Sequence, residues 1–409
     1  MKSILLVLVC FFSFSTVFSQ EIFQWRGDGR DGQYVESGLL NQWPEAGPEM
    51  AWSFDGLGRG YAAPVVAGDR LFINGEFEGD CYLFAIDLKG NLLWKTNMGE
   101  EFLGKGFSAT YPGSRSTPTV VDGLVYAVSG MGHMVCCDVA SGKIKWEKDY
   151  LKDLGGILPY FGISESLAID DENVYCYPTG VENNFVALDR LTGNSKWSSK
   201  AMSDTSSYCS PIFIELADRT VLVTMSHYSL IGLDKKDGKL LWSYDIQGFE
   251  AAGDHCNTPI YRDGFIYQVF GDRHSQGAVK LRLANDGSSV TEVWHNDRIK
   301  NNFAGFIIHD NLLFVTIRGN YLKALGLDDG QVVDSVKVSN GGLIFSDNKF
   351  ICYGQNGEVS LVNYTQGKFE TGGSFRLPKG KGQHFSQAVL SNGFMYLRHG
   401  DALRKYKVK

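Results

Sequence analysis

A short phrase that recurs along the chain constrains the fold more than any other feature of the sequence. Each copy contains a strand that ends in Asp, a turn that contains Gly, and a second strand that carries Trp. The clear copies span residues 85–94, 137–146, 187–197 and 232–242. A period of roughly 40–50 residues is typical of an array of equivalent sheet units. An all-β array of this kind predicts a β-propeller.

The residues of the phrase have structural roles in this prediction. We expect the Asp side chain to accept hydrogen bonds from backbone amides of its own turn, and the Gly to adopt a left-handed conformation. The indole is large, rigid and mostly apolar, so we expect it to pack between adjacent blades with its N–H bonded at the edge. The expected residues of these seams are Trp52, Trp94, Trp146, Trp197, Trp242 and Trp294.

Each repeat unit has the length of a four-stranded blade. The dipeptides Asp122-Gly123, Asp263-Gly264 and Asn392-Gly393 supply the positive φ angles of two-residue hairpin turns. The last unit, 384–408, holds too few strands for a blade, whereas residues 49–54 form a Trp-bearing strand with no preceding partners. We therefore predict an eight-bladed propeller of four-stranded antiparallel blades, with the last blade closed by this N-terminal strand. Seven blades is the alternative.

The N-terminus has the features of a secretory signal. An apolar run extends to Phe18, and the small residues Val17 and Ser19 suit a signal-peptidase site. We predict a signal peptide at 1–19 with cleavage near Ser19/Gln20, a lead-in segment at 20–48 and the propeller at 49–409. The apolar run is short for a membrane span, and no other stretch is suited to crossing a bilayer. The mature protein is then exported, to the periplasm or outside the cell.

Charge and cysteine usage narrow the class of partner. The net charge is −7, with both signs interspersed, which argues against a nucleic-acid binder. The cysteines beyond Cys10 form no CxxC pair, so the sequence predicts no zinc site. Their odd number leaves at least one thiol unpaired, and most are expected to be buried as small hydrophobes. The predicted partner is a protein or a small molecule.

One face of the predicted propeller carries the connections between blades and the turns between second and third strands. The inner ring of this loop-rich face is expected to hold Arg59, Arg115, Glu165, Tyr208, His255, Asn257, Asn302 and His384. The outer loops are expected to hold Glu76, His133, Glu182, His227, Arg273, His274, Arg318, Arg398 and His399, and residues 100–113 add Lys105 and Tyr111. Polar side chains directed at one axis predict a ligand pocket. The alternative is a solvated funnel without a ligand.

The phrase resembles the repeat of pyrroloquinoline-quinone (PQQ) enzymes, Ala-x-Asp-x-x-Thr-Gly-x-x-x-Trp. The resemblance covers residues 49–409, and Gln24-Trp25-Arg26-Gly27 and Arg30-Asp31-Gly32 are similar to the opening of secreted bacterial PQQ-like propeller proteins. This family contains quinoprotein dehydrogenases, BamB-like outer-membrane assembly scaffolds and members without a defined activity. Because the signature residues are structural, the resemblance implies the fold and leaves the function open.

For a dehydrogenase, the resemblance implies a specific set of cofactor contacts. Arginine would bind the carboxylates of PQQ, and calcium would be held by Glu and Asn oxygens. Arg115, Glu165 and Asn257 stand in a suitable order along the chain, and Asp254 would accept the proton of an alcohol.

Other positions depart from the dehydrogenases. Cys136 and Cys137 are adjacent within a strand, where neighbours point to opposite faces and do not form a bridge. The inner ring has no Trp, and the sequence has no CxxCH haem site. We therefore expect a binding or scaffolding protein at the bacterial envelope, with no assigned catalytic residue and no metal. The alternatives are a PQQ-dependent alcohol or sugar dehydrogenase-like oxidoreductase and a carbohydrate-binding accessory module.

Overall fold

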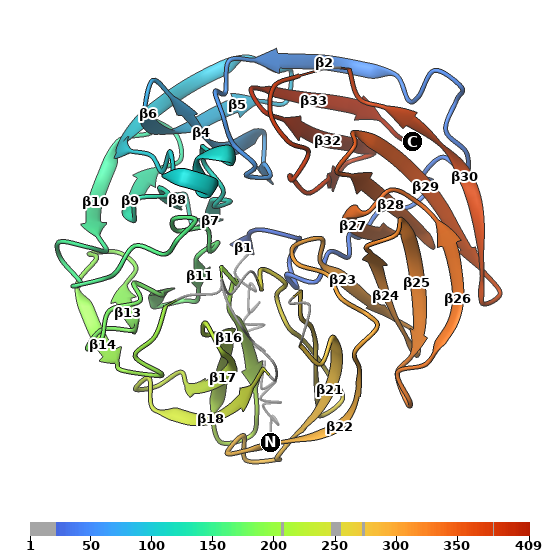
Figure 1. Ribbon diagram of the computed structural model, residues 1–409. Helices are drawn as coiled ribbons and strands as arrows, with labels where there is room; N and C mark the ends of the chain where they lie inside the picture. The colour runs from blue at the N-terminus through green and yellow to red at the C-terminus, as the bar shows by residue number, and fades with distance from the viewer. Residues whose placement is uncertain (1–21, 206–207, 247–254, 272–274, 379) are drawn as a thin grey trace, which may run out of the picture.

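The computed structural model describes residues 22–205, 208–246, 255–271, 275–378 and 380–409. Within these ranges, eight antiparallel sheets form a ring (Figure 1), so the predicted eight-bladed propeller is confirmed and the seven-bladed alternative is wrong. Each hydrophobic cluster of the core contains strands from two neighbouring blades. The core is therefore a circle of seams between blades.

The first four blades follow the chain in order. Blade 1 contains β3 (Val65–Ala67), β4 (Arg70–Phe77), β5 (Asp80–Asp87) and β6 (Leu92–Glu100), and the 3-10 helix η1 (Gly106–Thr110) follows it. Blade 2 contains β7 (Thr119–Val121), β8 (Leu124–Val128), β9 (His133–Asp138) and β10 (Ile144–Asp149). Blade 3 contains β11 (Ala168–Ile169), β12 (Asn173–Cys176), β13 (Phe185–Asp189) and β14 (Ser195–Ser199). Blade 4 contains β15 (Ile212–Glu215), β16 (Thr220–Met225), β17 (Ser229–Asp234) and β18 (Leu240–Asp245).

The second half of the ring repeats this plan. Blade 5 contains β19 (Ile260–Arg262), β20 (Phe265–Val269), β21 (Ala278–Leu283) and β22 (Val290–Asn296). Blade 6 contains β23 (Phe306–His309), β24 (Leu312–Ile317), β25 (Tyr321–Gly326) and β26 (Val332–Lys337). Blade 7 contains β27 (Gly341–Ser346), β28 (Lys349–Gly354), β29 (Glu358–Thr365) and β30 (Lys368–Arg376). Blade 8 contains β31 (Val389–Ser391), β32 (Phe394–His399) and β33 (Ala402–Lys407), with β2 (Met50–Asp55) as its fourth strand.

The N-terminal strand closes the ring as predicted. β2 pairs antiparallel with β33, with Trp52 opposite Lys405 and Asp55 opposite Ala402. Closure in this way pairs the edge of the last blade and ties the two ends of the propeller together.

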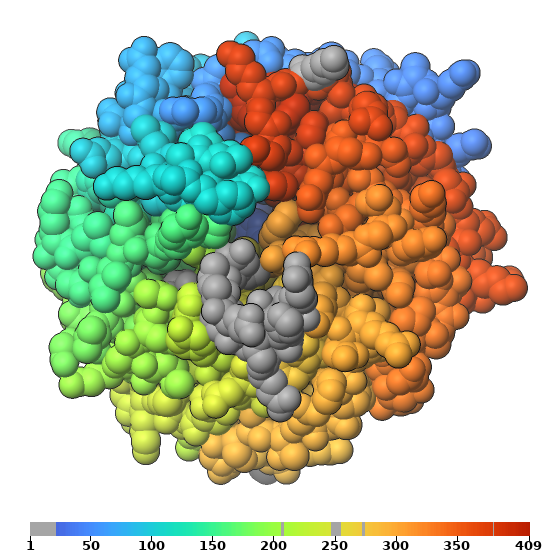
Figure 2. All heavy atoms as spheres, in the orientation of Figure 1, coloured from blue at the N-terminus to red at the C-terminus, as the bar shows by residue number. Residues whose placement is uncertain are grey.

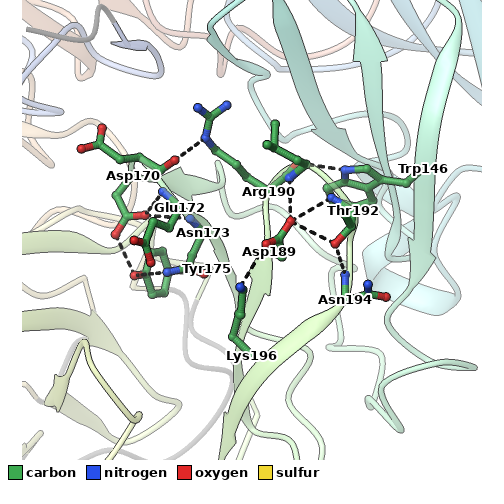
Figure 3. Close-up of polar contacts among 12 residues, drawn as sticks. Trp146, Asp170, Glu172, Asn173, Tyr175, Asp189, Arg190, Thr192, Asn194 and Lys196 are labelled. Atoms are coloured by element: carbon green, nitrogen blue, oxygen red, sulfur yellow. Dashed lines mark hydrogen bonds and ion pairs between the residues drawn. The ribbon is translucent and has the colours of Figure 1, made fainter.

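The repeated phrase joins neighbouring blades. In blade 3, Asp189 Oδ1 accepts hydrogen bonds from the amides of Leu191 (3.1 Å) and Thr192 (3.0 Å). The next carbonyl, that of Arg190, accepts the indole N–H of Trp146 from blade 2 at 2.9 Å (Figure 3). The same contact, at 2.9–3.1 Å, joins Trp52 to Leu88, Trp94 to Val139, Trp197 to Lys235 and Trp294 to Leu327. Five of the six expected Trp residues thus make the hydrogen bond across a seam, and Asp189 accepts backbone amides of its own turn as expected.

The Gly of the phrase also makes room for the indole, a role that the sequence did not reveal. A Cβ on Gly142 would lie 2.5 Å from the ring of Trp94. Blade 5 departs from this pattern, because the Gly of its turn, Gly287, packs against Val221 instead of an indole. The buried Nε1 of Trp242, at the seam before blade 5, has no hydrogen-bond partner in the described part of the chain.

The lead-in enters the central channel. β1 (Ile22–Phe23) pairs with β7 and becomes an additional inner strand of the sheet of blade 2. The chain then turns, and Gln33 forms a parallel bridge with Phe345 of β27. Figure 1 places β1 near the centre of the ring, and Figure 2 shows blue N-terminal atoms deep in the central hollow of the visible face. We call residues 22–34 the plug.

A buried arginine fastens the plug to three blades. Arg26 donates to the carbonyls of Leu343 (3.0 Å) and Phe306 (2.9 Å). It also donates to Gln387 Oε1 at 3.3 Å. Burial lowers the pKa of Arg26 to about 10, so the guanidinium stays charged at neutral pH. A second buried arginine, Arg30, fastens the plug to blade 3.

Two further expectations concern membrane-spanning segments and the cysteines. Among the described residues, no helix is long and apolar enough to cross a membrane. The cysteines there form no disulfide bond with one another, and all are buried except the half-buried Cys256. They behave as the small hydrophobes that the sequence predicts.

Candidate functional site

Aromatic side chains gather where the first strands begin on the loop-rich face. We call this set the aromatic cluster: Tyr61, Phe107, Tyr111, Tyr160, Phe161, Tyr208, Phe303 and Phe385. The Phe385 ring lies 4.8 Å from that of Phe303 and 5.5 Å from that of Tyr61, between centroids. The Tyr111 ring lies 5.8 Å from Phe385 and 6.2 Å from Phe161. Rings that precede the first strands of several blades therefore contact one another in a continuous series.

Sequence reasoning named only Tyr111 and Tyr208 of this cluster. A signal for the rest was present, because Tyr61, Tyr208 and Phe385 each precede the first strand of a blade by four residues (61 and 65, 208 and 212, 385 and 389). An aromatic residue at the same place in several repeats marks a shared position at the mouth of the channel.

A groove of about 500 Å³ opens beside the cluster, at the seam between blades 8 and 1. Its lining includes Arg59, Tyr61, Phe77, Glu78, Lys381 and Asp401. The predicted inner residue Arg59 is half exposed and forms an ion pair with the buried carboxylate of Glu76, which raises the pKa of Arg59. The volume is within the range of sites that hold a small ligand or a peptide segment.

Arg115 belongs to the surroundings of the aromatic cluster. Its guanidinium donates to the carbonyls of Gly113 (2.9 Å) and Tyr111. It lies 5.7 Å from the centroid of Tyr61, at cation–π distance. Burial lowers the pKa of Arg115. The side chain holds the 100–113 connection against blade 1.

Both the nitrogen and the oxygen of the Asn257 side-chain amide have hydrogen-bond partners inside the protein. Its Nδ2 donates to the carbonyls of Val269 (2.9 Å) and Asn301 (2.7 Å). Its Oδ1 accepts the amide of Gly305 at 2.9 Å. The neighbouring prediction, Asn302, contributes its backbone carbonyl to the amide of Cys256 at 2.9 Å. These residues tie blade 5 to blade 6.

Glu165 lies buried between blades 2 and 3. Its Oε1 accepts the hydroxyl of Tyr150 (2.8 Å) and the amide of Tyr177 (2.9 Å). Its Oε2 has no hydrogen-bond partner among the described residues. Burial raises the pKa of Glu165 to about 7, and the hydrogen bonds from Tyr177 and Tyr150, followed by the charge of Arg30, oppose that shift. The carboxyl therefore titrates near neutral pH.

Two histidines stack in blade 8. The rings of His384 and His399 lie 3.6 Å apart, and His384 Nδ1 is 2.8 Å from the hydroxyl of Tyr353. Burial, and then the neighbouring His399, lower the pKa of His384 to about 4. His384 is thus neutral at pH 7.

The other inner-ring predictions also have internal contacts. His255 is buried, and its Nδ1 accepts the amide of Gly271 at 3.3 Å. The hydroxyl of Tyr208 accepts the amide of Phe161 at 3.2 Å, within the aromatic cluster. The structure therefore brings Arg59, Arg115 and Tyr208 toward the mouth, whereas Glu165, His255, Asn257 and His384 lie in the walls between blades.

Arg398 is a correction to the predicted outer loops. It is fully buried and donates to the carbonyls of Asn74 (2.5 Å) and Gly400 (2.9 Å). The end of β32 points its guanidinium into the seam with blade 1, where backbone carbonyls need a donor. Burial lowers the pKa of Arg398 to about 10.

The remaining outer residues fall into two groups. In the first group, which the structure describes, His133 forms an ion pair with Glu147 at 3.2 Å and Glu182 forms one with Lys200 at 2.8 Å. Lys105 and Arg318 are exposed, and His227 is half-buried. The predicted outer residues Arg273 and His274 lie outside the described residues, and so does Asp254, the expected proton acceptor of a dehydrogenase.

The residues that the dehydrogenase resemblance assigns do not fit PQQ with calcium. The Asn257 amide and one Glu165 oxygen already have protein partners. Cys136 and Cys137 belong to hydrophobic clusters on opposite sides of β9. In the described ranges, no group of three or more His, Cys, Asp or Glu side chains is arranged to hold a metal ion.

The sequence comparisons give relatives described as outer membrane protein assembly factor BamB. A family model described as outer membrane protein assembly factor BamB matches residues 79–336. The outer membrane protein assembly factor BamB of Moranella endobia (strain PCIT) is 22% identical over 314 residues, which cover 73% of this chain and 71% of that protein.

Solved structures agree in fold. BamB from Moraxella catarrhalis has a TM-score of 0.60 and 11% identity, covering 88% of this chain and 98% of that one. The quinohemoprotein alcohol dehydrogenase from Comamonas testosteroni has a TM-score of 0.62 and 14% identity, covering 94% of this chain and 80% of that one. At such identities the likeness concerns the fold alone.

Proposed function

We propose a function from one premise: this chain belongs to the family described as outer membrane protein assembly factor BamB, whose model matches more than half of it. The protein is a PQQ-like propeller that binds another protein at the bacterial envelope, through its loop-rich face. Its role is to hold a partner in place, and its rigid ring of blades provides the platform.

The observation that carries this proposal is an arc of exposed apolar side chains. It consists of Phe77, Leu103, Phe107, Ile157, Tyr160, Val181 and Tyr228. All of these residues lie in loops or strand ends of blades 1–4 on the loop-rich face. Phe107 is 64% exposed and Tyr160 is 53% exposed. Exposed apolar and aromatic side chains gathered on one face are typical of a protein-binding site.

The groove between blades 8 and 1 extends this surface. Tyr61 belongs both to the groove and to the aromatic cluster, and Phe77 belongs both to the groove and to the apolar arc. A partner segment in the groove would therefore continue directly onto the aromatic rings. Anchoring aromatic side chains at the centre of such a surface contribute most of the binding energy.

Site-specific cross-linking tests the proposal. A photoreactive phenylalanine replaces Phe107 in the arc, and in a matched protein it replaces Leu191, which is equally exposed on the opposite face. We expect the first protein to cross-link, in intact envelopes, to a protein of the outer membrane or of its assembly, identified by mass spectrometry. Equal cross-linking from both positions would contradict binding through the loop-rich face.

Export is part of the proposal. The relatives are outer membrane assembly factors by name, and the N-terminal 1–19 has the composition of a signal peptide. We propose cleavage near Ser19/Gln20, a lead-in at 20–48, a propeller at 49–409 and a periplasmic or extracellular location. N-terminal sequencing of the protein from the envelope fraction should begin at Gln20. Recovery of the full chain from the cytosol would contradict export.

A carbohydrate-binding accessory role is the second candidate, and the aromatic cluster favours it. Exposed rings such as those of Phe107 and Tyr160 offer flat apolar faces on which sugars can stack. Binding to envelope glycans that is lost in a Phe107→Ser, Tyr160→Ser double variant would support this role over protein binding.

A further inference from the structure

Positive charge gathers on the loop-rich face of blades 6 and 7, in the turns after their second strands and the connections after their fourth strands. We call these loops the basic rim: residues 318–321, 337–340, 355–358, 376–378 and 380–383. Its exposed cations are Arg318, Lys337, Arg376 and Lys381. Glu358 is the only carboxylate of the rim, and it lies 4.0 Å from Arg376. The rim is therefore positive, although the whole chain has a net charge of −7.

Most of this charge is not neutralised within the protein. Three of the rim cations form no ion pair with the residues that the structure describes, namely Arg318, Lys337 and Lys381. The exposed lysines that follow blades 2 and 3 on the same face are paired instead. Lys152 lies 3.4 Å from Asp149, and Lys200 lies 2.8 Å from Glu182. The rim can therefore offer its charge to a partner.

Hydrogen bonds between the loops hold the rim in one shape. Asn320 Oδ1 accepts the amide of Asn340 at 3.2 Å, and the Asn340 carbonyl accepts the amide of Gln355 at 2.9 Å. Arg376 Nη1 donates to the carbonyl of Asn356 at 2.8 Å. The loops of the two blades, which are neighbours in the ring (Figure 1), thus form one surface. A surface that is already ordered loses little conformational entropy when a partner binds.

The rim continues into the groove between blades 8 and 1, because Lys381 belongs to both. The groove offers two aromatic rings together with the carboxylates of Glu78 and Asp401. The cation of the groove, Arg59, is already paired with Glu76. Apolar side chains of a ligand would therefore find contacts in the groove, whereas carboxylates would be repelled there. An acidic stretch fits only beyond Lys381, on the rim.

We propose that the loop-rich face recognises an extended segment of its protein partner, with apolar side chains in the groove and a neighbouring acidic stretch over the basic rim. This inference rests on the proposed protein-binding function and adds the chemistry of the partner. A chain segment can enter a groove of about 500 Å³, whereas the surface of a bilayer cannot. The guanidinium groups of Arg318 and Arg376 suit carboxylates, to which they can donate two parallel hydrogen bonds.

Cross-linking from Tyr321 tests this inference. Tyr321 is 42% exposed, begins β25 and pairs with Lys337 on the rim. A photoreactive phenylalanine replaces Tyr321 in the full-length protein, and intact envelopes are irradiated. We expect capture of the same protein as from Phe107, through a peptide in which Asp and Glu outnumber Lys and Arg, identified by mass spectrometry. A neutral or basic peptide, or a lipid or glycan adduct in place of a protein, would overturn the inference.

The two probe positions distinguish this inference from the proposed function. Cross-linking from Phe107 without any from Tyr321, or capture of different proteins at the two positions, would overturn the acidic segment and leave protein binding intact. The absence of cross-linking from both positions would contradict the proposed function itself, and the inference with it.

Charge reversal at the two ends of the rim gives a second test. In an Arg318→Glu, Lys381→Glu double variant, we expect the yield of the Tyr321 cross-link to fall about tenfold, because exposed ion pairs with the partner are lost. The matched control is Lys143→Glu, Lys236→Glu, which makes the same change in net charge at exposed positions on the opposite face. It should keep the wild-type yield. Equal losses in both variants would overturn the assignment to the rim.

Salt dependence tests the charge without a substitution. Raising the salt concentration from about 50 to about 300 mM should lower the wild-type yield several-fold and change the yield of the rim variant little, because exposed charges are screened. Both double variants should unfold thermally like the wild type, since their substituted side chains are exposed. A wild-type yield that does not respond to salt would overturn the acidic segment.

Discussion

Trp52 donates its indole N–H to the carbonyl of Leu88 at 2.9 Å, and this contact joins the last blade to the first. Trp242 occupies the same place in the phrase of blade 4, but its buried Nε1 has no partner among the residues described. The two residues separate two contributions of the repeated Trp, namely the packing of the ring and the hydrogen bond across the seam.

We predict that Trp52→Phe is more destabilising than Trp242→Phe by about 1 kcal/mol. Both substitutions shorten the ring, but only Trp52→Phe removes an indole hydrogen bond across the seam, although the Leu88 carbonyl keeps Lys405 Nζ at 3.0 Å as a second donor. Urea unfolding of the two variants and the wild type gives the comparison. A larger loss for Trp242→Phe would show that the hydrogen bond across the seam contributes nothing.

Gly142→Ala should destabilise the protein strongly. The φ angle of Gly142 is +70°, and a Cβ there would lie 2.5 Å from the ring of Trp94. Gly123→Ala is the matched control, since its φ is +74° and nothing lies within 4 Å of the added carbon. We expect about 1 kcal/mol for the control and roughly 2 kcal/mol more for Gly142→Ala, measured by thermal unfolding. Equal losses would mean that the indole moves aside freely.

Arg26→Lys should cost about 3 kcal/mol, although it keeps the charge. The planar guanidinium reaches the carbonyls of Leu343 and Phe306 together, and an ammonium cannot occupy both directions. The control is Arg376→Lys at the exposed rim of blade 7, which should change the free energy of unfolding by less than about 0.5 kcal/mol. A loss for Arg26→Lys no larger than that of the control would show that the plug is not fastened through Arg26.

His384 should make the folded protein sensitive to acid. Its folded-state pKa of about 4 lies below its ordinary value of 6.5, so its contribution is complete above pH 6.5 and is lost as the pH falls toward 4. Because the ring is half-exposed, we expect only roughly 1 kcal/mol between pH 7 and 5. His384→Gln should lack this part of the decline, measured as the difference from the wild type in urea unfolding at each pH. Parallel curves would contradict the assignment.

The repeat made the blades predictable. Asp, Gly and Trp recur because the seams that carry the phrase use the same turn and, at Trp52, Trp94, Trp146, Trp197 and Trp294, the same indole hydrogen bond. The pattern of one turn therefore repeats in the sequence. The closing strand was predictable for a related reason, since residues 49–54 lacked partners and the last blade lacked a strand. The role of Gly beneath the indole was not predictable, because it depends on a contact between two blades.

The candidate site was predicted only in part. The inner positions were correctly placed before the first strands, but residue type did not reveal which side chains face the opening. Asn257 and Glu165 look like ligands in the sequence, whereas in the structure the side-chain oxygen of Asn257 and one carboxylate oxygen of Glu165 bond neighbouring backbone and hydroxyl groups. Phe385 looks like an ordinary apolar residue, whereas it connects Tyr61, Tyr111 and Phe303.

The sequence by itself determined the number of blades, their phase and the way the ring closes, because these features follow from local patterns that repeat. Only the tertiary structure decided that residues 22–34 lie in the channel, that Arg26 joins three blades and that aromatic rings from several blades contact one another. Those arrangements depend on the closed circle, which brings residues as distant as Arg26 and Gln387 to one axis. Contacts of that range leave no periodic mark in a sequence, so they appear only after the ring has formed.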